Sequence, residues 1–307
     1  MTTKWMYYLG LVLVAAIWGA NFGVQRLAMD TFDPMLFNFL RFGLAAPLFF
    51  VLLKITEGSV GIPWKVALKL ALIGLFGVTL LEMTVMYSIK YTTLANASLL
   101  SIAPWPIFAA LFAPLFFKEK FSARLAVGAA AAMAGVSLII VGGGQGMSLS
   151  SDNMVGNLIA LSTGIIGGIY NVACMPLMKQ YSALRVSTWV IMFGSLFMIP
   201  MTIGSWGKVD WAQLTAGHYT AIAYNALFCT FIAFSVWNTC MLKIGATRSN
   251  FFRYVVPASA MVVGFAFFRE SISGWQLAGT LCMAAGLVWI STESSKRVPA
   301  PELTTAR

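Results

Sequence analysis

The chain contains the same pattern twice, 151 residues apart. In the first copy Pro106 precedes the run FFKE at 116–119, and in the second Pro257 precedes FFRE at 267–270. Further identities keep the same offset: Ala95 and Ala246, Ser98 and Ser249, Ser122 and Ser273, Gly128 and Gly279, Ala134 and Ala285, and Gly135 and Gly286. This run of identities without a gap indicates an internal duplication. Duplicated hydrophobic units are common among secondary transporters, whose two halves rock against each other.

The composition places the duplicated unit in a membrane. Hydrophobic residues make up 59% of the 307 residues and charged residues only 10%, far from the average of soluble proteins. A helix of about 20 apolar residues can cross the ~30 Å hydrocarbon core of a bilayer. Ten such stretches lie at about 5–25, 34–53, 66–89, 92–117, 124–141, 155–178, 187–206, 219–242, 246–268 and 274–292. The first lacks a small-x-small cleavage site and is too long for a signal peptide, so we expect it to remain as a span.

The predicted fold is therefore all-α integral membrane, with ten transmembrane helices arranged as two inverted five-helix repeats. We place the first repeat at 1–141, a Gly-rich linker at 142–154, the second repeat at 155–292 and a polar tail at 293–307. Five crossings leave the chain on the opposite side of the membrane. The second repeat is therefore expected to be inserted upside down relative to the first.

The distribution of Lys and Arg predicts the orientation. With the N-terminus in the cytoplasm, the inner segments hold fourteen of these residues and the outer loops hold four: Arg26, Lys90, Lys208 and Arg269. Inner loops are the ones enriched in Lys and Arg, so both termini are expected in the cytoplasm and the chain in the cytoplasmic membrane. The net charge of +10 lies beside helix ends, where anionic lipid headgroups are a sufficient partner. We expect no nucleic acid partner.

Catalytic and cofactor chemistry find little support in the sequence. The four cysteines (Cys174, Cys229, Cys240 and Cys282) all lie in apolar spans without a CxxC pair or a nearby histidine, so we predict neither a metal site nor a disulfide. His218, the one histidine, falls in a predicted outer loop, where we expect it to be solvated. No span holds two acidic residues, and no glycine loop of the Walker type is present. We therefore predict that the protein is not an enzyme, has no cofactor and does not use ATP directly.

Three ionisable residues lie well inside predicted spans: Arg41, Glu82 and Arg253. Burying an ionisable group in lipid costs free energy, so we expect each of these residues to have a structural or functional role. At ~1.5 Å per residue, Arg41 and Glu82 both lie roughly 10 Å from the outer end of their helices, so the two side chains can pair. The pair is either a structural salt bridge or a coupling or gate element that exchanges a proton for substrate. Arg253 lies at a similar depth from the inner face and either snorkels to the headgroups or attracts a substrate carboxylate.

Aromatic and amide residues gather on four of the predicted spans. Trp18, Asn21 and Gln25 share one face of the first span, and Ser101 and Trp105 share a face of the fourth. Tyr170-Asn171 in the sixth span and Trp237-Asn238 in the eighth each place an aromatic ring beside an amide. A cavity lined by these groups could pack an apolar side chain and hydrogen-bond a zwitterion. Packing between helices is the alternative role for each of them.

Prolines lie inside spans of both halves, and each half has a glutamate at the equivalent position of the repeat. Pro104, Pro106, Pro176 and Pro257 lie inside spans, where proline removes a helix hydrogen bond, and we expect hinge or gate positions there. Glu119 and Glu270 precede helices that Ser122 and Ser273 can cap. We interpret both glutamates as structural.

The order of these motifs resembles the drug/metabolite transporter superfamily, and specifically its EamA-type ten-helix exporters. The resemblance rests on the opening motif at 18–22 (WGANF), on Asp33-Pro34 followed by Arg41, and on the duplicated blocks, and it covers almost the whole chain. It implies export of amino acids or other small metabolites from a central cavity lined by the first, third, fourth, sixth, eighth and ninth helices. A nucleotide-sugar or sugar-phosphate translocator, a passive channel and a lipid flippase remain as alternatives, and proton coupling stays open.

Overall fold

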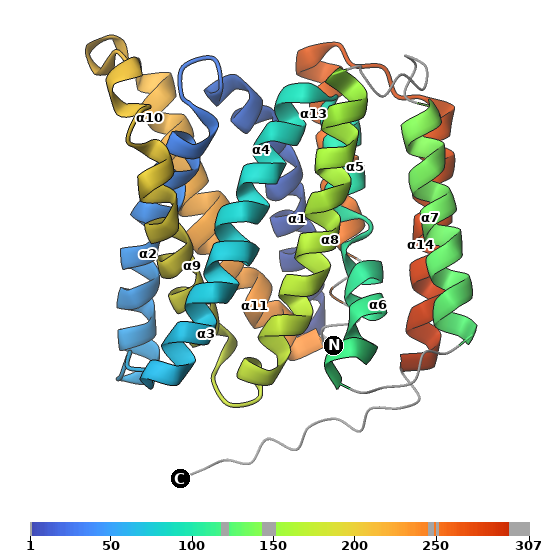
Figure 1. Ribbon diagram of the computed structural model, residues 1–307, viewed down its shortest axis with the longest axis horizontal. Coiled ribbons are helices and arrows are strands. Elements are labelled where there is room, and N and C mark those ends of the chain that lie inside the picture. The colour runs from blue at the N-terminus through green and yellow to red at the C-terminus, as the bar shows by residue number, and fades with distance from the viewer. Residues whose placement is uncertain (1, 118–122, 143–151, 245–248, 250–251, 295–307) are drawn as a thin grey trace.

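The computed structural model describes residues 2–117, 123–142, 152–244, 249 and 252–294. Within these residues the regular secondary structure is entirely helical, and the helices form one upright bundle (Figure 1). The first half contains α1 (Thr2–Ala28), α2 (Pro34–Glu57), α3 (Trp64–Gly74), the π-helix η1 (Leu75–Leu80), α4 (Leu81–Tyr91), α5 (Leu94–Ile102), α6 (Trp105–Phe117) and α7 (Ala123–Gly142). The second half contains α8 (Asp152–Met178), α9 (Ala183–Thr202), the 3₁₀ turns η2 (Trp206–Lys208) and η3 (Trp211–Gln213), α10 (Ala216–Ala223), the π-helix η4 (Tyr224–Ile232), α11 (Ala233–Ile244), the 3₁₀ turn η5 (Phe252–Tyr254), α13 (Val255–Phe268) and α14 (Gly274–Ser294).

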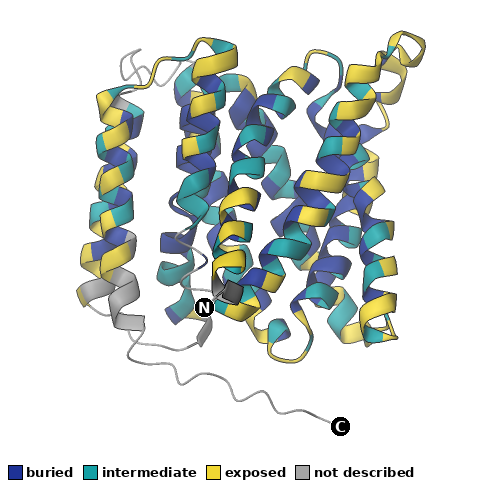
Figure 2. Ribbon diagram, turned by 180° about the vertical axis from the view of Figure 1, so that it is seen from behind, coloured by how far each residue is buried: buried dark blue, intermediate teal, exposed yellow. Residues whose placement is uncertain are grey.

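Seven of these helical stretches are long and apolar enough to cross a membrane. They are Trp5–Ala28, Pro34–Glu57, Trp64–Tyr91, Leu94–Leu115, Asn153–Met178, Ala183–Thr202 and Ala216–Ile244. Ala126–Ile140 and Phe252–Phe268 are shorter apolar helices. Exposed positions run along whole helices and not only at their ends (Figure 2), and many carry large apolar side chains such as Leu44, Ile55 and Leu281. A surface of this kind suits lipid contact, because the backbone groups in the interior of a helix are hydrogen-bonded within the helix.

Helices of the first half pack against helices of the second half in two corresponding sets of contacts. In one set, α1 of the first half packs on α13 of the second. In the other, α8 of the second half packs on α5 and α6 of the first. The last helices of the two halves, α7 and α14, also pack on each other, at the edge of the bundle in Figure 1. A Cβ on Gly135 would lie 2.5 Å from Gly279 O, and a Cβ on Gly279 would lie 2.5 Å from Gly135 O. Glycine is therefore required on both sides of this crossing.

Two of the buried clusters join helices that are far apart in the sequence. One joins α2, α3 and α9 through Phe42, Phe49, Leu70, Val190 and Met198. The other joins α1, α4, α5 and α13 through Ala15, Val85, Leu94, Ala97 and Ala260. Because each cluster contains helices from both halves, the two repeats are interleaved instead of lying side by side.

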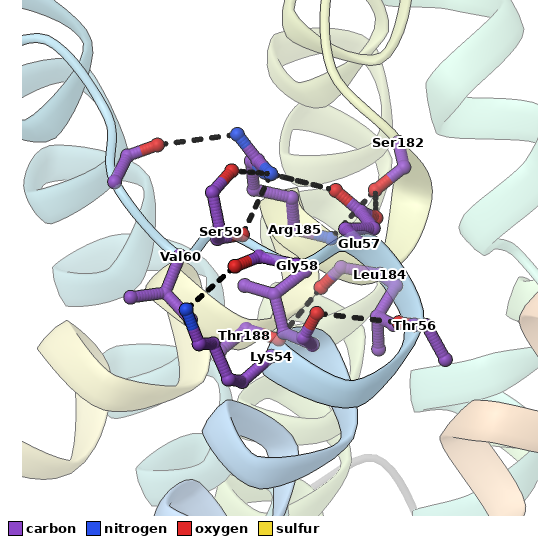
Figure 3. Close-up of polar contacts among 12 residues, drawn as sticks. Lys54, Thr56, Glu57, Gly58, Ser59, Val60, Ser182, Leu184, Arg185 and Thr188 are labelled. Carbon is purple, nitrogen blue, oxygen red and sulfur yellow. Dashed lines mark hydrogen bonds and ion pairs between the residues drawn. The ribbon is translucent and has the colours of Figure 1, made fainter.

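Arg185 of α9 bonds the C-terminal end of α2 and the residues that follow it (Figure 3). Its guanidinium forms an ion pair with Glu57 at 2.9 Å and donates to the carbonyl oxygens of Ser59 and Gly61 at 2.8 and 3.2 Å. Trp189 Nε1 donates to the carbonyl oxygen of Val60 at 2.9 Å. The connection between α2 and α3 is thus bound to α9 at this end of the bundle.

Only some of the prolines that were expected to interrupt helices coincide with a break. Pro104 lies in the break between α5 and α6, whereas Pro176 lies within the continuous helix α8. The larger irregularities are η1 and η4, two π-helical segments inside the third and eighth predicted spans. Neither segment contains a proline, so proline positions could not reveal them. Segments of this kind occur frequently at functional sites.

Candidate functional site

A cavity of about 130 Å³ lies between the two buried clusters. Eight of the residues predicted as site residues line it: Trp18, Asn21, Gln25, Arg41, Glu82, Trp105, Tyr170 and Arg253. Most of the remaining wall is apolar: Phe22, Phe42, Val78, Leu81, Val85, Ile102, Ile191, Phe234 and Val256. The cavity therefore combines a hydrophobic lining with a small number of polar and charged groups, as ligand pockets do.

Four predicted site residues do not line the cavity. The Ser101 hydroxyl donates to the carbonyl oxygen of Ala97 in its own helix, and Asn171 is half-buried elsewhere on α8. Trp237 and Asn238 lie one layer behind the wall. The Trp237 ring packs on Trp18 with centroids 5.1 Å apart, and Asn238 Nδ2 donates to Ser187 Oγ at 3.3 Å.

Arg41 and Glu82 form the ion pair that their depths permit. Arg41 Nη1 lies 3.1 Å from Glu82 Oε2, and the two side chains are only 5% and 12% exposed. Arg41 Nε also donates to Thr230 Oγ1 at 2.7 Å, in the π-helix η4. The guanidinium therefore connects α2, α4 and η4 at the cavity wall, with its buried charge compensated by a carboxylate and a hydroxyl.

Arg253 lies against two indole rings. Its guanidinium carbon is 4.6 Å from the ring centroid of Trp105 and 5.1 Å from that of Trp237. Both tryptophans are buried, and a desolvated cation gains most from contact with an indole face. The guanidinium also lines the cavity, which is the position that a carboxylate-binding residue requires. The charged groups of the wall are therefore the guanidiniums of Arg41 and Arg253 and the carboxylate of Glu82.

Glycines and a backbone carbonyl determine where the aromatic side chains lie. A Cβ on Gly77 would lie 2.1 Å from Tyr170 Cδ2, and a Cβ on Gly167 would lie 2.4 Å from Trp105 Cδ2. Trp18 Nε1 donates to the carbonyl oxygen of Cys229 at 2.9 Å, within η4. The glycines thus allow two rings to lie directly on a neighbouring helix, and the π-helix supplies the acceptor for a third.

Sequence reasoning missed several lining residues. Phe22 is four positions after Trp18 and three before Gln25, so the same helical face could have identified it. Gly77, Ser187 and Phe234 carried no comparable signal, because an isolated glycine, serine or phenylalanine in an apolar span is ordinary.

His218 is not the solvated residue that we expected. It is half-buried, and its Nδ1 accepts a hydrogen bond from the backbone N–H of Thr215 at 2.9 Å as part of a capping box at the start of α10. Its Nε2 lies 3.0 Å from the Thr31 hydroxyl. The unpaired N–H at the start of a helix requires an acceptor, and the histidine ring provides it. Among the described residues, no group of three His, Cys, Asp or Glu side chains could hold a metal ion.

Ser273 caps α14 as the sequence predicts. Its hydroxyl accepts from Gln276 N at 3.1 Å, and Gln276 Oε1 accepts from Ser273 N at 2.9 Å. Glu119 and Ser122, the corresponding residues of the first repeat, lie outside the described residues.

Comparison with known proteins identifies relatives over nearly the full chain. The model of the EamA-like transporter family matches residues 5–141 and 154–292. The chain is 26% identical over 281 residues to a Bacillus subtilis (strain 168) protein named "Uncharacterized transporter YetK", covering 91% of this chain and 85% of that protein. It is 27% identical over 290 residues to a Streptantibioticus cattleyicolor protein named "Probable terminal-alkyne amino-acid exporter", covering 94% of each. A solved crystal structure superposes with a TM-score of 0.64 at 16% identity, over 94% of this chain and 96% of the other. At that identity the match shows a shared fold.

Proposed function

Because this chain belongs to the EamA-like transporter family and is a multi-pass membrane protein, we propose that it exports amino acids or similar small metabolites across the cytoplasmic membrane. The observation that carries the proposal is the cavity, in which Arg253 and two tryptophans accompany a largely apolar wall. A guanidinium on an indole face suits the carboxylate of a substrate, and the apolar wall suits its side chain. The name of the relative from Streptantibioticus cattleyicolor supports amino acids as the substrate class.

The proposed mechanism is alternating access by two inverted five-helix repeats. We assign the repeats to 1–141 and 155–292, the linker to 142–154 and a cytoplasmic tail to 293–307, with ten spans and both termini in the cytoplasm. The reciprocal packing of α1 on α13 and of α8 on α5 and α6 supports this assignment, because inverted repeats exchange equivalent contacts. The π-helix η1 lines the cavity through Gly77 and Val78. The π-helix η4, in the corresponding span, bonds the wall residues Trp18 and Arg41, and both segments are candidate places for the helices to bend.

A nucleotide-sugar or sugar-phosphate translocator is a weaker candidate. A phosphate ester carries about two negative charges and prefers several bidentate cations. Of the two guanidiniums in the cavity wall, Arg41 is already paired with Glu82.

Efflux from loaded membrane vesicles tests the proposal. The full chain would be reconstituted, loaded with a panel of radiolabelled L-amino acids, and compared with vesicles that contain no protein. We expect saturable efflux of at least one amino acid with an apolar side chain. Release of a sugar phosphate without release of any amino acid would reject the proposal in favour of the translocator.

Trp105 provides the matching test of the site. We expect Trp105→Ala to reduce efflux by about tenfold or more, since it removes an indole in contact with Arg253, while the amount of protein in the membrane stays near that of the wild type. A loss of protein from the membrane, with unchanged efflux per molecule, would assign Trp105 to packing.

A further inference from the structure

Two buried polar atoms in the cavity wall lack a hydrogen-bond partner within the described part of the chain. They are the acceptor Asn21 Oδ1 and the donor Trp105 Nε1. Asn21 is 4% exposed and Trp105 is 8% exposed, and both residues line the cavity. Buried polar atoms are almost always hydrogen-bonded. Of the five buried atoms without a partner in the described residues, the two in the cavity wall are one donor and one acceptor, which together complement a ligand that carries both kinds of group.

The position of Asn21 on α1 directs it away from the helix contact. Gly19 and Gly23 pack on α13, where a Cβ on either would lie within 2.5 Å of Val256 O or Val263 Cγ1. Asn21 is two positions from each glycine, which corresponds to a rotation of about 200° around the helix. Trp18 and Gln25, which share the face of Asn21, also line the cavity. The amide therefore belongs to the cavity face of α1 and not to its packing face.

The polar groups of the wall complement both charged groups of a zwitterion. Trp105 Nε1 belongs to the indole on which the Arg253 guanidinium lies, so a hydrogen-bond donor and a cation lie together in this part of the wall. Asn21 offers a carbonyl oxygen that also lacks a partner among the described residues. A donor and a cation suit a carboxylate, whereas an amide oxygen suits an ammonium group.

We propose that Asn21 is a specificity-determining residue that selects substrates with an α-amino group. Its Oδ1 accepts a hydrogen bond from the substrate ammonium, while Trp105 Nε1 and Arg253 donate to the substrate carboxylate. The cavity then takes zwitterionic amino acids with apolar side chains and rejects the same carboxylates without the amino group. A site built to bond a polar group rejects an analogue that lacks it far more strongly than an apolar pocket rejects a change of size. This inference rests on the proposed function and goes beyond it by assigning the discrimination to one residue.

Binding to the purified full chain tests this assignment. The ligands are L-phenylalanine, L-leucine and L-tryptophan, each paired with the corresponding carboxylate without the amino group, such as 3-phenylpropanoate for L-phenylalanine. Wild-type protein is expected to bind at least one amino acid about 100-fold more tightly than its partner. Asn21→Leu is expected to weaken binding of the amino acid by about 30-fold and to leave binding of the carboxylate nearly unchanged. Asn21→Asp, which keeps an acceptor, should retain the preference.

Two further variants separate the contributions. Asn171→Leu changes an amide on α8 that does not line the cavity and should leave both affinities unchanged. Trp105→Phe keeps a ring but removes the donor, and should weaken the amino acid and the carboxylate by the same factor. Equal weakening of both ligands in Asn21→Leu, at normal protein stability, would overturn the role of Asn21 and leave the proposed function intact. If no amino acid binds to the wild type, both the proposed function and this inference fail.

Discussion

Arg26 Nη1 and Glu270 Oε1 form an ion pair of 2.6 Å between the last turn of α1 and the segment that follows α13. The same carboxylate accepts from the backbone N–H groups of Leu94 and Ala95 at 2.9 and 3.3 Å, at the start of α5. Arg26 Nη2 donates to the carbonyl oxygen of Thr92 at 2.6 Å. Two side chains from opposite ends of the sequence thus tie together α1, α4, α5 and α13 at the upper end of the bundle in Figure 1.

Glu270→Gln is expected to loosen this end of the bundle. The variant removes the charge from an ion pair and from a carboxylate at a helix N-terminus, interactions that together contribute about 1–3 kcal/mol. The melting temperature of the purified protein should fall by a few degrees. Arg269→Gln is the control, because Arg269 is an exposed neighbour; an equal fall in that variant would contradict the importance of the ion pair.

For the buried pair of Arg41 and Glu82, we expect the double variant to be more stable than either single variant. Because both side chains are buried, removing one partner leaves an uncompensated charge and costs about 3 kcal/mol or more, whereas neutralising both costs less. We expect Glu82→Gln and Arg41→Gln each to lower the melting temperature more than the double variant does. Additive effects of the two substitutions would show that the residues do not depend on each other.

Glu82→Gln also separates a gate from a coupling residue. Glutamine keeps the shape of the side chain and cannot exchange a proton. For a gate or structural pair, we expect stability and both modes of transport to fall together. Normal stability with loss of pH-driven accumulation, but retained exchange of substrate, would instead assign Glu82 to proton coupling.

Gly77→Ala should disturb the cavity through Tyr170. The added Cβ would lie 2.1 Å from Tyr170 Cδ2, so the ring must move. Overpacking of this kind costs about 1–3 kcal/mol, and we expect substrate affinity to fall by about tenfold. Gly61→Ala is the matched control, because a Cβ there meets no atom within 4 Å. Unchanged affinity in Gly77→Ala would mean that the Tyr170 ring is not needed where it lies.

The inverted arrangement predicts the location of two reporters. A reporter fused after Gly143 should be outside the cell, and one fused after Lys296 should be inside; both positions lie outside the described residues. An odd number of spans in the first half requires this difference. A cytoplasmic signal at Gly143 would reject the inverted repeat.

Position along the helix axis could be predicted from the sequence, and rotation around that axis only in part. The distances of Arg41 and Glu82 from their helix ends predicted the pair, because a helix rises by a constant ~1.5 Å per residue. The spacing of Trp18, Asn21 and Gln25 predicted a shared face for the same reason. The duplicated motif and the apolar composition likewise indicated a helical membrane protein with two related halves.

The neighbours of each face were decided by the tertiary structure. Trp237 and Asn238 lie behind the cavity wall, and Glu270 meets Arg26, which is 244 residues away in the chain. The π-helix η4 supplies acceptors to Arg41 and Trp18 through Thr230 and the carbonyl oxygen of Cys229. The periodicity of a single helix specifies which of its residues share a face. It does not specify which other helix that face meets, because this depends on the packing of all the helices at once.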